Sequence, residues 1–207
     1  MIKTIIFDLG GVIMTLEQEE AKRRFVALGL EDVEDYMNQY TQSGIFGDLE
    51  SGKITGEEFR VKISEITGRE VSYEACKHAW LGYKKELPQR NIEILKQLRK
   101  EGFRLVLLSN TNEFMVSWAE SDFDGKGGSI KDYFDAVYYS FQMRTMKPDT
   151  MFFRKVLMKE EAYPEDCLFV DDGPRNVAAA SELGIRTFCP ENGADWTEEI
   201  RKYIDNK

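Results

Sequence analysis

The sequence has a single histidine and few cysteines, which narrows the chemistry that the chain could perform. His78 is the only histidine in 207 residues, so histidine-ligated metals and histidine-based catalytic triads are excluded. The three cysteines are widely spaced, which is typical of reduced, packed cysteines and not of a disulfide framework or a zinc site. Carboxylates, lysine, serine and asparagine are left to carry any reaction.

Long apolar runs and clusters of basic residues are also missing. No segment approaches the roughly 18 apolar residues of a transmembrane helix, and the first residues lack a secretory signal pattern, so we expect a cytoplasmic protein with no membrane partner. With a net charge of −9 and no long Lys/Arg run, the chain is not expected to bind nucleic acid. A small anionic substrate remains compatible, because a bound cation and one or two lysines can reverse the local field. We expect a monomer or a weak homodimer.

The chain begins with a short apolar run that ends at an acid. Ile2 to Phe7 are almost all apolar and rich in β-branched side chains, and the sequence DLGG follows at once. This pattern predicts a strand buried on both faces, as in a parallel sheet. Ligands bind at the carboxyl ends of the strands in such sheets, so Asp8 is a candidate site residue, with an ordinary turn or helix-capping acid as the alternative.

The second half of the chain alternates between helical and strand-like segments. FRLVLLSN, AVYYS, CLFVDD and IRTFCP predict four further strands, separated by amphipathic helical segments. This order implies an α/β fold with a doubly wound, Rossmann-like, five-stranded parallel sheet and right-handed crossovers. Residues 196–207 are expected to close the chain as a helix.

Residues 17–87 contain no convincing strand and are expected to form a helical cap inserted after the first strand. Four amphipathic segments joined by short Gly/Ser turns predict a small bundle, with the second helix over residues 33–46. Residues 1–16 and 88–207 then form the α/β core. We expect the aromatic residues of the bundle mainly to pack it against the core, while its position beside Asp8 also suits a lid.

Polar residues follow three of the five predicted strands, and parallel strands bring these ends to the same edge of the sheet. Taken singly, each has an ordinary explanation as a helix cap, a turn residue or a surface lysine, but all of them together are harder to explain in that way. The residues are Asp8, Ser109, Asn110, Asp171 and Asp172, together with Lys147 from the connection between the third and fourth strands.

Three carboxylates gathered without histidine suit a hard divalent cation such as Mg²⁺, which takes one or two protein carboxylates and substrate phosphate. The reaction that this favours is phosphoryl transfer, which depends on positioning and charge neutralisation. Asp8 can be the nucleophile that forms an aspartyl-phosphate, and the Gly10 carbonyl can face the metal. The Ser109 hydroxyl and the Lys147 ammonium can bind the remaining phosphate oxygens.

The same residues carry a family resemblance. FDLGGV, LLSN, KPD and FVDDGPRN occur in this order and span most of the chain. They resemble the four motifs of the haloacid dehalogenase-like (HAD) hydrolase superfamily, in the subfamily with a helical C1 cap between the first and second motifs. More narrowly, FDLGGV, LESGKIT and VDDGPRNV are similar to the sugar-1-phosphate phosphatase branch that includes α-D-glucose-1-phosphate phosphatase.

This resemblance implies a Mg²⁺-dependent phosphatase that hydrolyses a small phosphorylated metabolite, with a sugar phosphate as one option, through an aspartyl-phosphate. It makes Asp8 the nucleophile and Asp172 the preferred direct metal ligand of the pair of neighbouring acids. The implied catalytic residues are Asp8 and Lys147, and the implied metal ligands are Asp8, Gly10, Asp171 and Asp172. The implied phosphate ligands are Ser109, Asn110 and Lys147, and Asn176 is expected to lie behind the metal ligands.

Position 10 departs from the family pattern. Most phosphatases of this superfamily have a second aspartate two residues after the nucleophile, which protonates the leaving group, whereas this chain has Gly10. General acid–base help is worth about 10²–10⁴ in rate, so a phosphomutase is disfavoured. A phosphatase stays possible if the leaving group is good, as an anomeric oxygen is, or if a bound water or a cap residue replaces the acid. A catalytically silent phosphate- or partner-binding protein, and a metal-free haloacid dehalogenase, remain as alternatives.

Overall fold

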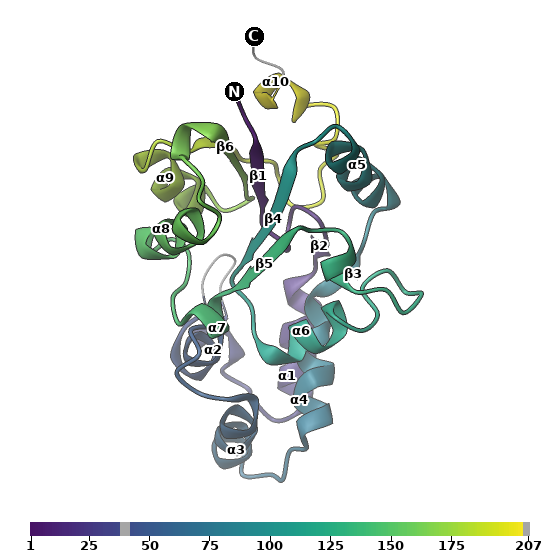
Figure 1. Cartoon of the computed structure of the whole chain (residues 1–207). Coiled ribbons are helices and arrows are strands. Elements are labelled where there is room, and N and C mark those ends of the chain that lie inside the picture. Colours follow the sequence, from purple (N-terminus) through teal and green to yellow (C-terminus); the bar gives the residue numbers. More distant parts are fainter. Residues whose placement is uncertain (38–41, 205–207) are drawn as a thin grey trace.

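A five-stranded parallel sheet forms the centre of the computed structural model, which describes residues 1–37 and 42–204 (Figure 1). Its strands are β1 (Thr4–Phe7), β4 (Arg104–Ser109), β5 (Ala136–Tyr139), β6 (Cys167–Val170) and β7 (Arg186–Phe188). They are arranged in the order β5-β4-β1-β6-β7, with β1 paired in parallel to β4 and β6. The predicted doubly wound α/β fold is confirmed, and the end of β1 lies at the middle of the sheet edge.

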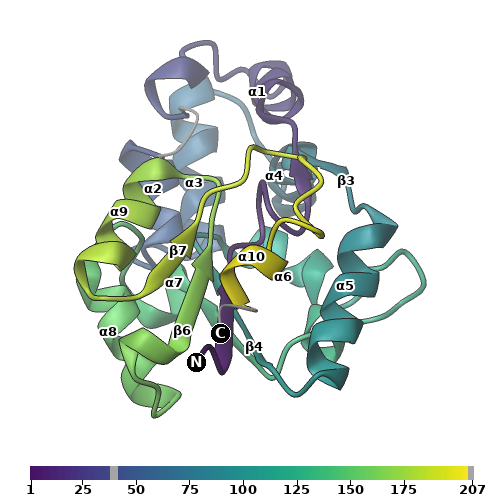
Figure 2. The same cartoon turned by 90° about the horizontal axis from the view of Figure 1, so that it is seen from above.

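Helices cover both faces of this sheet. They are α5 (Gln89–Lys100), α6 (Glu113–Ala119), α7 (Ser140–Met143), α8 (Thr150–Lys159), α9 (Pro174–Glu182) and α10 (Arg201–Ile204), with 3₁₀ turns η3 (Ile130–Asp132) and η4 (Pro164–Asp166). α5 lies on one side of the sheet, and α8 and α9 lie on the other (Figures 1 and 2). Because strand side chains alternate, Ile5 and Phe7 share a buried cluster with residues of α5, and Ile6 shares one with residues of α8 and α9. All three side chains are fully buried, which explains the continuous apolar run.

Four helices form a bundle beside the carboxyl end of the sheet (Figure 1). They are α1 (Gln18–Ala27), α2 (Gly44–Glu50), α3 (Gly56–Thr67) and α4 (Tyr73–Trp80), with 3₁₀ turns η1 (Val33–Asp35) and η2 (Leu81–Tyr83). Phe25, Phe46, Phe59 and Trp80 are buried against one another, and Phe59 also contacts Phe114 of α6. The aromatic residues therefore fill the bundle as well as joining it to the core. The division into a 17–87 cap and a core of 1–16 and 88–207 stays a prediction.

A short antiparallel pair corrects the expectation that residues 17–87 hold no strand. β2 (Thr15–Leu16) pairs with β3 (Lys84–Glu86), where the chain leaves the core and where it returns. All three residues of β3 are exposed, so the strand has no alternation of apolar and polar residues. The pair forms because the two segments that connect the core to the helical bundle run side by side and share backbone hydrogen bonds. The sequence pattern does not predict such a pair.

The predicted helix over residues 33–46 and the predicted terminal helix are also corrected. Residues 33–35 form only η1, and α2 starts at Gly44, because Ser43 is extended and Gly44 has a φ of +53°. Residues 38–41, with Tyr40, lie outside the described part of the chain. Near the terminus only α10 is an α-helix within the described residues, because Trp196 is buried and bonded to the loop after β1. None of the helices in the two described ranges is long and apolar enough to cross a membrane.

Candidate active site

The loop after β1 carries Asp8 and is held by two buried polar side chains. The Asn91 amide donates to two carbonyl oxygens of the loop, those of Val12 and Ile13, both at 3.0 Å. The Trp196 indole N–H donates to the Val12 carbonyl at 2.8 Å. These bonds satisfy buried loop carbonyls and fix the course of the chain directly after the nucleophile candidate.

Positions 10 and 11 of this loop are both glycine, but for different structural reasons. Gly11 has a φ of +76°, and a Cβ there would lie 2.1 Å from Asp172 Oδ2, so only glycine lets the loop pass this carboxylate. At Gly10 a Cβ would lie 2.8 Å from Cδ1 of Leu16, the far end of a flexible side chain. Glycine is therefore required at position 11, whereas at position 10 the neighbouring space is filled by Leu16.

Three carboxylates meet at the ends of β1 and β6. One carboxylate oxygen from each of Asp8, Asp171 and Asp172 lies within 4.8 Å of the others. The Lys147 Nζ lies 2.8 Å from Asp8 Oδ1 and 2.6 Å from Asp171 Oδ2. Since one ammonium cannot balance three carboxylates, this oxygen donor set fits a divalent cation such as Mg²⁺.

The pKa shifts follow from burial and crowding. Burial, with added repulsion from Asp171 and Asp172, raises the pKa of Asp8 to about 8, although Lys147 opposes the rise. Burial and the charge of Asp171 raise the pKa of Asp172 to about 6. Burial alone would lower the pKa of Lys147, but Asp171 and Asp8 outweigh it and the pKa is raised. Lys147 therefore stays charged, and the cluster has an excess of negative charge that a bound cation would relieve.

Asp171 and Asp172 have different surroundings. Asp171 is fully buried and accepts hydrogen bonds from the Gly173 N–H at 2.7 Å, the Asn176 amide at 3.0 Å and Lys147 at 2.6 Å. Asp172 is half-buried, and no other described residue donates a hydrogen bond to its carboxylate. The structure thus places Asn176 against Asp171 and leaves Asp172 the more open ligand.

Asn110 and Ser109 lie at the end of β4. The Asn110 side chain donates to the Lys147 carbonyl at 2.8 Å and accepts from the Lys147 N–H at 2.8 Å. The Asn110 side chain therefore positions the backbone of Lys147. The predicted contact between Asn110 and phosphate stays a prediction, and it would use other groups of this residue. Among the residues that the structure describes, the buried Ser109 hydroxyl contacts only the Asn110 carbonyl, at 3.4 Å, which leaves it available to a ligand.

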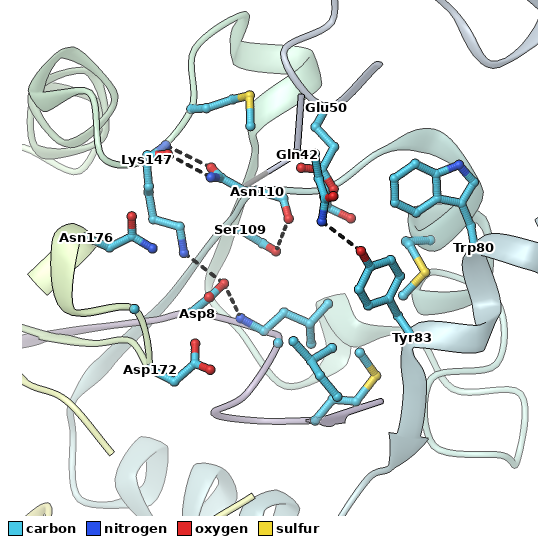
Figure 3. Close-up of a pocket in the computed structure, with 18 residues that line it drawn as sticks. Asp8, Gln42, Glu50, Trp80, Tyr83, Ser109, Asn110, Lys147, Asp172 and Asn176 are labelled. Atoms are coloured by element: carbon cyan, nitrogen blue, oxygen red, sulfur yellow. Dashed lines mark hydrogen bonds and ion pairs between the residues drawn. The ribbon is translucent and has the colours of Figure 1, made fainter. Parts of the chain in front are cut away.

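These residues surround one cavity of about 120 Å³ (Figure 3). Every predicted site residue except Asp171, which lies behind the wall, lines it. The opposite wall of the cavity comes from the helical bundle. The residues of this wall were not identified from the sequence, since only their position within the inserted segment pointed to them. The principal polar and aromatic ones are Gln42, Glu50, Trp80 and Tyr83.

The chain resembles several known proteins over most or all of its length. Residues 2–184 match the family model described as haloacid dehalogenase-like hydrolase. D-ribitol-5-phosphate phosphatase of Bacteroides thetaiotaomicron is 42% identical over 207 residues, which is all of both chains.

Solved structures agree with this assignment. A protein from Porphyromonas gingivalis described as a predicted HAD-like family hydrolase has a TM-score of 0.94 and 40% identity, with both chains fully covered. A HAD family enzyme from B. thetaiotaomicron, in complex with magnesium and inorganic phosphate, has a TM-score of 0.88 and 34% identity over 97% of this chain and 100% of that one. With motifs, sheet order and site geometry in agreement, the chain belongs to the haloacid dehalogenase-like hydrolase family.

Proposed function

We propose that this chain is a Mg²⁺-dependent phosphatase that hydrolyses the phosphate ester of a small sugar or sugar alcohol through an aspartyl-phosphate on Asp8. The observation that carries the proposal is the cluster of Asp8, Asp171 and Asp172 around the Lys147 ammonium at the end of the central strand. It is supported by a relative of the same length that acts on D-ribitol 5-phosphate and by a similar structure that binds magnesium and phosphate.

Each residue has a defined part in this proposal. A carboxylate oxygen of Asp8 attacks phosphorus, while Lys147 and the Ser109 hydroxyl bind the phosphate oxygens. Asp171 holds Lys147 charged and in place, since its carboxylate lies 2.6 Å from the ammonium. Asp8, Asp172 and the Gly10 carbonyl would hold Mg²⁺, with Asp171 as a further carboxylate of the cluster, and the bound ion would supply charge neutralisation for the transferred phosphoryl group.

For the substrate, we favour a phosphorylated pentitol or pentose. The full-length relative acts on a five-carbon polyol phosphate, and the cap wall of the cavity offers the polar groups of Gln42 and Tyr83 to hydroxyl groups. A sugar 1-phosphate is the second candidate, because Gly10 supplies no acid and an anomeric oxygen is a better leaving group than an ordinary alkoxide.

A substrate panel tests these proposals. Ribitol 5-phosphate, ribose 5-phosphate, glucose 1-phosphate and p-nitrophenyl phosphate would be compared with Mg²⁺ and with EDTA. We expect the highest kcat/KM on a pentitol or pentose phosphate, no phosphate release with EDTA, and recovery when Mg²⁺ is restored. Release from no ester would favour the silent binding protein, and turnover of a haloacid that survives EDTA would favour the dehalogenase.

The finer expectations about partners and location stay predictions. They are a cytoplasmic protein, a monomer or weak homodimer, and no binding to nucleic acid or membrane. Gel filtration with light scattering would measure the oligomeric state directly. A stable higher oligomer would contradict the expectation.

A further inference from the structure

Glu50 is a buried carboxyl group that the proposed roles do not use. It is the last residue of α2, is 8% exposed and lines the cavity, which its side chain enters from the cap side while Asp8 enters from the sheet side (Figure 3). Within the described ranges no residue forms a hydrogen bond or ion pair with its carboxyl group. Because the side chain faces the cavity and has no such partner, a ligand bound there can become the partner of its carboxyl group.

The backbone at Glu50 is fastened to the core. The buried Ser140 hydroxyl donates to the Glu50 carbonyl at 2.6 Å and accepts from the Thr111 N–H at 2.9 Å. Two residues further on, Gly52 has a φ of +72°, and a Cβ there would lie 2.1 Å from the Phe141 carbonyl oxygen. Glu50 is therefore positioned relative to the end of β4 by direct contacts, as a group that must meet a reacting atom needs to be.

The direction of attack places the leaving oxygen toward the cap. In phosphoryl transfer the attacking and leaving oxygens are roughly in line with phosphorus, so the leaving oxygen points away from Asp8. When an alkyl phosphate ester is cleaved, the leaving group is an ordinary alkoxide, which needs a proton. Gly10 carries no acid and Leu16 fills the space beside it, whereas Glu50 lies across the cavity from Asp8.

The other ionisable groups of the cavity wall are poor donors. Lys147 is held between two carboxylates, and Asp172 belongs to the proposed metal site. Burial, with the nearby Glu50, raises the pKa of the Tyr83 hydroxyl far above neutrality. Burial also raises the pKa of Glu50, to about 8, against the opposing charge of Lys147, so this carboxyl group carries a proton at neutral pH.

We propose that Glu50 is the general acid of the reaction, in the place of the aspartate that position 10 lacks; this rests on the phosphatase function proposed above. As the bond from Asp8 to phosphorus forms and the ester P–O bond breaks, the Glu50 carboxyl gives its proton to the leaving oxygen, which departs as an alcohol. Water then attacks the aspartyl-phosphate, Asp8 leaves as a carboxylate with release of inorganic phosphate, and the second proton of that water returns to Glu50.

The test is the leaving-group dependence of Glu50→Gln, which keeps the size of the side chain and has no acidic proton. With enzyme in excess and Mg²⁺ present, rapid quench would follow the first turnover of ribitol 5-phosphate, and stopped-flow absorbance that of p-nitrophenyl phosphate. We expect the variant to cleave the alkyl ester about 10²–10⁴-fold more slowly. The first-turnover release of nitrophenolate should stay near the wild-type rate, because this leaving group needs no proton.

Tyr83→Phe is the matched control from the same wall: it should weaken binding of ribitol 5-phosphate, whose hydroxyl groups Tyr83 can meet, and should leave the first-turnover rate at saturating enzyme near the wild-type value for both esters. The alkyl-ester rate of the wild type should also fall at alkaline pH as Glu50 loses its proton, and this limb should be missing in Glu50→Gln. Equal losses on both esters, or no loss on the alkyl ester, would overturn the role of Glu50. Failure of the wild type to release nitrophenolate and phosphate from either ester would instead overturn the phosphatase function itself.

Discussion

The two walls of the cavity differ in how their polar groups are satisfied. On the core wall, Lys147 binds Asp8 and Asp171 at 2.8 and 2.6 Å, and its backbone is paired with the Asn110 amide at 2.8 Å. On the cap wall, the Glu50 carboxyl has no partner within the described part of the chain. The Gln42 Oε1 and the Trp80 Nε1 atoms are likewise buried without a hydrogen bond there.

This difference separates the chemistry from the choice of substrate. On the core wall Asp8, Asp171, Asn110 and Lys147 are already held by one another, as a site for a constant phosphoryl group requires. Polar groups left unpaired in a cavity discriminate strongly against ligands that cannot complete their hydrogen bonds. We infer that the core wall handles the phosphate and that the cap wall meets the alcohol.

Asp8→Asn, on the core wall, is expected to have the largest effect. Turnover should fall by about 10⁴-fold or more, because an amide cannot form the acyl phosphate. Stability should not fall, since the change removes a negative charge from a crowded cluster. Phosphate release and a urea melt would be measured on the same sample; turnover at the wild-type rate would show that Asp8 is not the nucleophile.

Lys147→Met is expected to have the next largest effect, and it tests the ion pairs that hold the core wall together. Loss of the ammonium leaves Asp8 and Asp171 without their cation, which should destabilise the fold by about 3–5 kcal/mol. Urea denaturation would measure it. Lys53→Met is the control, because Lys53 pairs with Asp48 at the surface of the cap and should change little. Similar effects of the two substitutions would contradict the interlocked arrangement.

Glu50→Gln should change the pH dependence of stability. Burial raises the pKa of Glu50 from 4.5 to about 8 in the folded protein, so the folded state binds this proton more tightly than the unfolded state. Its contribution to stability is complete below about pH 4.5 and is lost as the pH rises toward 8. Relative to the variant, the wild type should lose on the order of 1–4 kcal/mol across this range. Urea titrations at several pH values would reveal it, and parallel curves would argue against a buried, protonated Glu50.

Thr55→Ala should have the smallest effect and should leave the chemistry unchanged. Thr55 caps α3, where its hydroxyl accepts from the Glu58 N–H at 3.2 Å and its own N–H donates to Glu58 at 2.7 Å. Its loss should cost about 1 kcal/mol in a urea melt with no change in kcat/KM. A drop in activity as large as that of Glu50→Gln would mean that general loosening of the cap, and not one carboxyl group, controls turnover.

The core wall could be predicted because its signals are local. The run before Asp8 and the acids after β6 sit at strand ends, and the parallel topology brings such ends together without knowledge of packing. The exchange of hydrogen bonds between Asn110 and Lys147 could not be foreseen, since it depends on how two loops distant in sequence meet.

The sequence alone determined the parallel sheet, the order of its strands along the chain and the acids at its edge, because apolar runs ending in polar residues are local and periodic. Only the tertiary structure decided which cap residues face the cavity. Glu50 follows Asp8 by 42 positions, and an acid at the end of an amphipathic helix looks the same whether it meets water or a substrate. Its burial comes from the way α2 packs on the core through Ser140 and Gly52, and no local pattern encodes that contact.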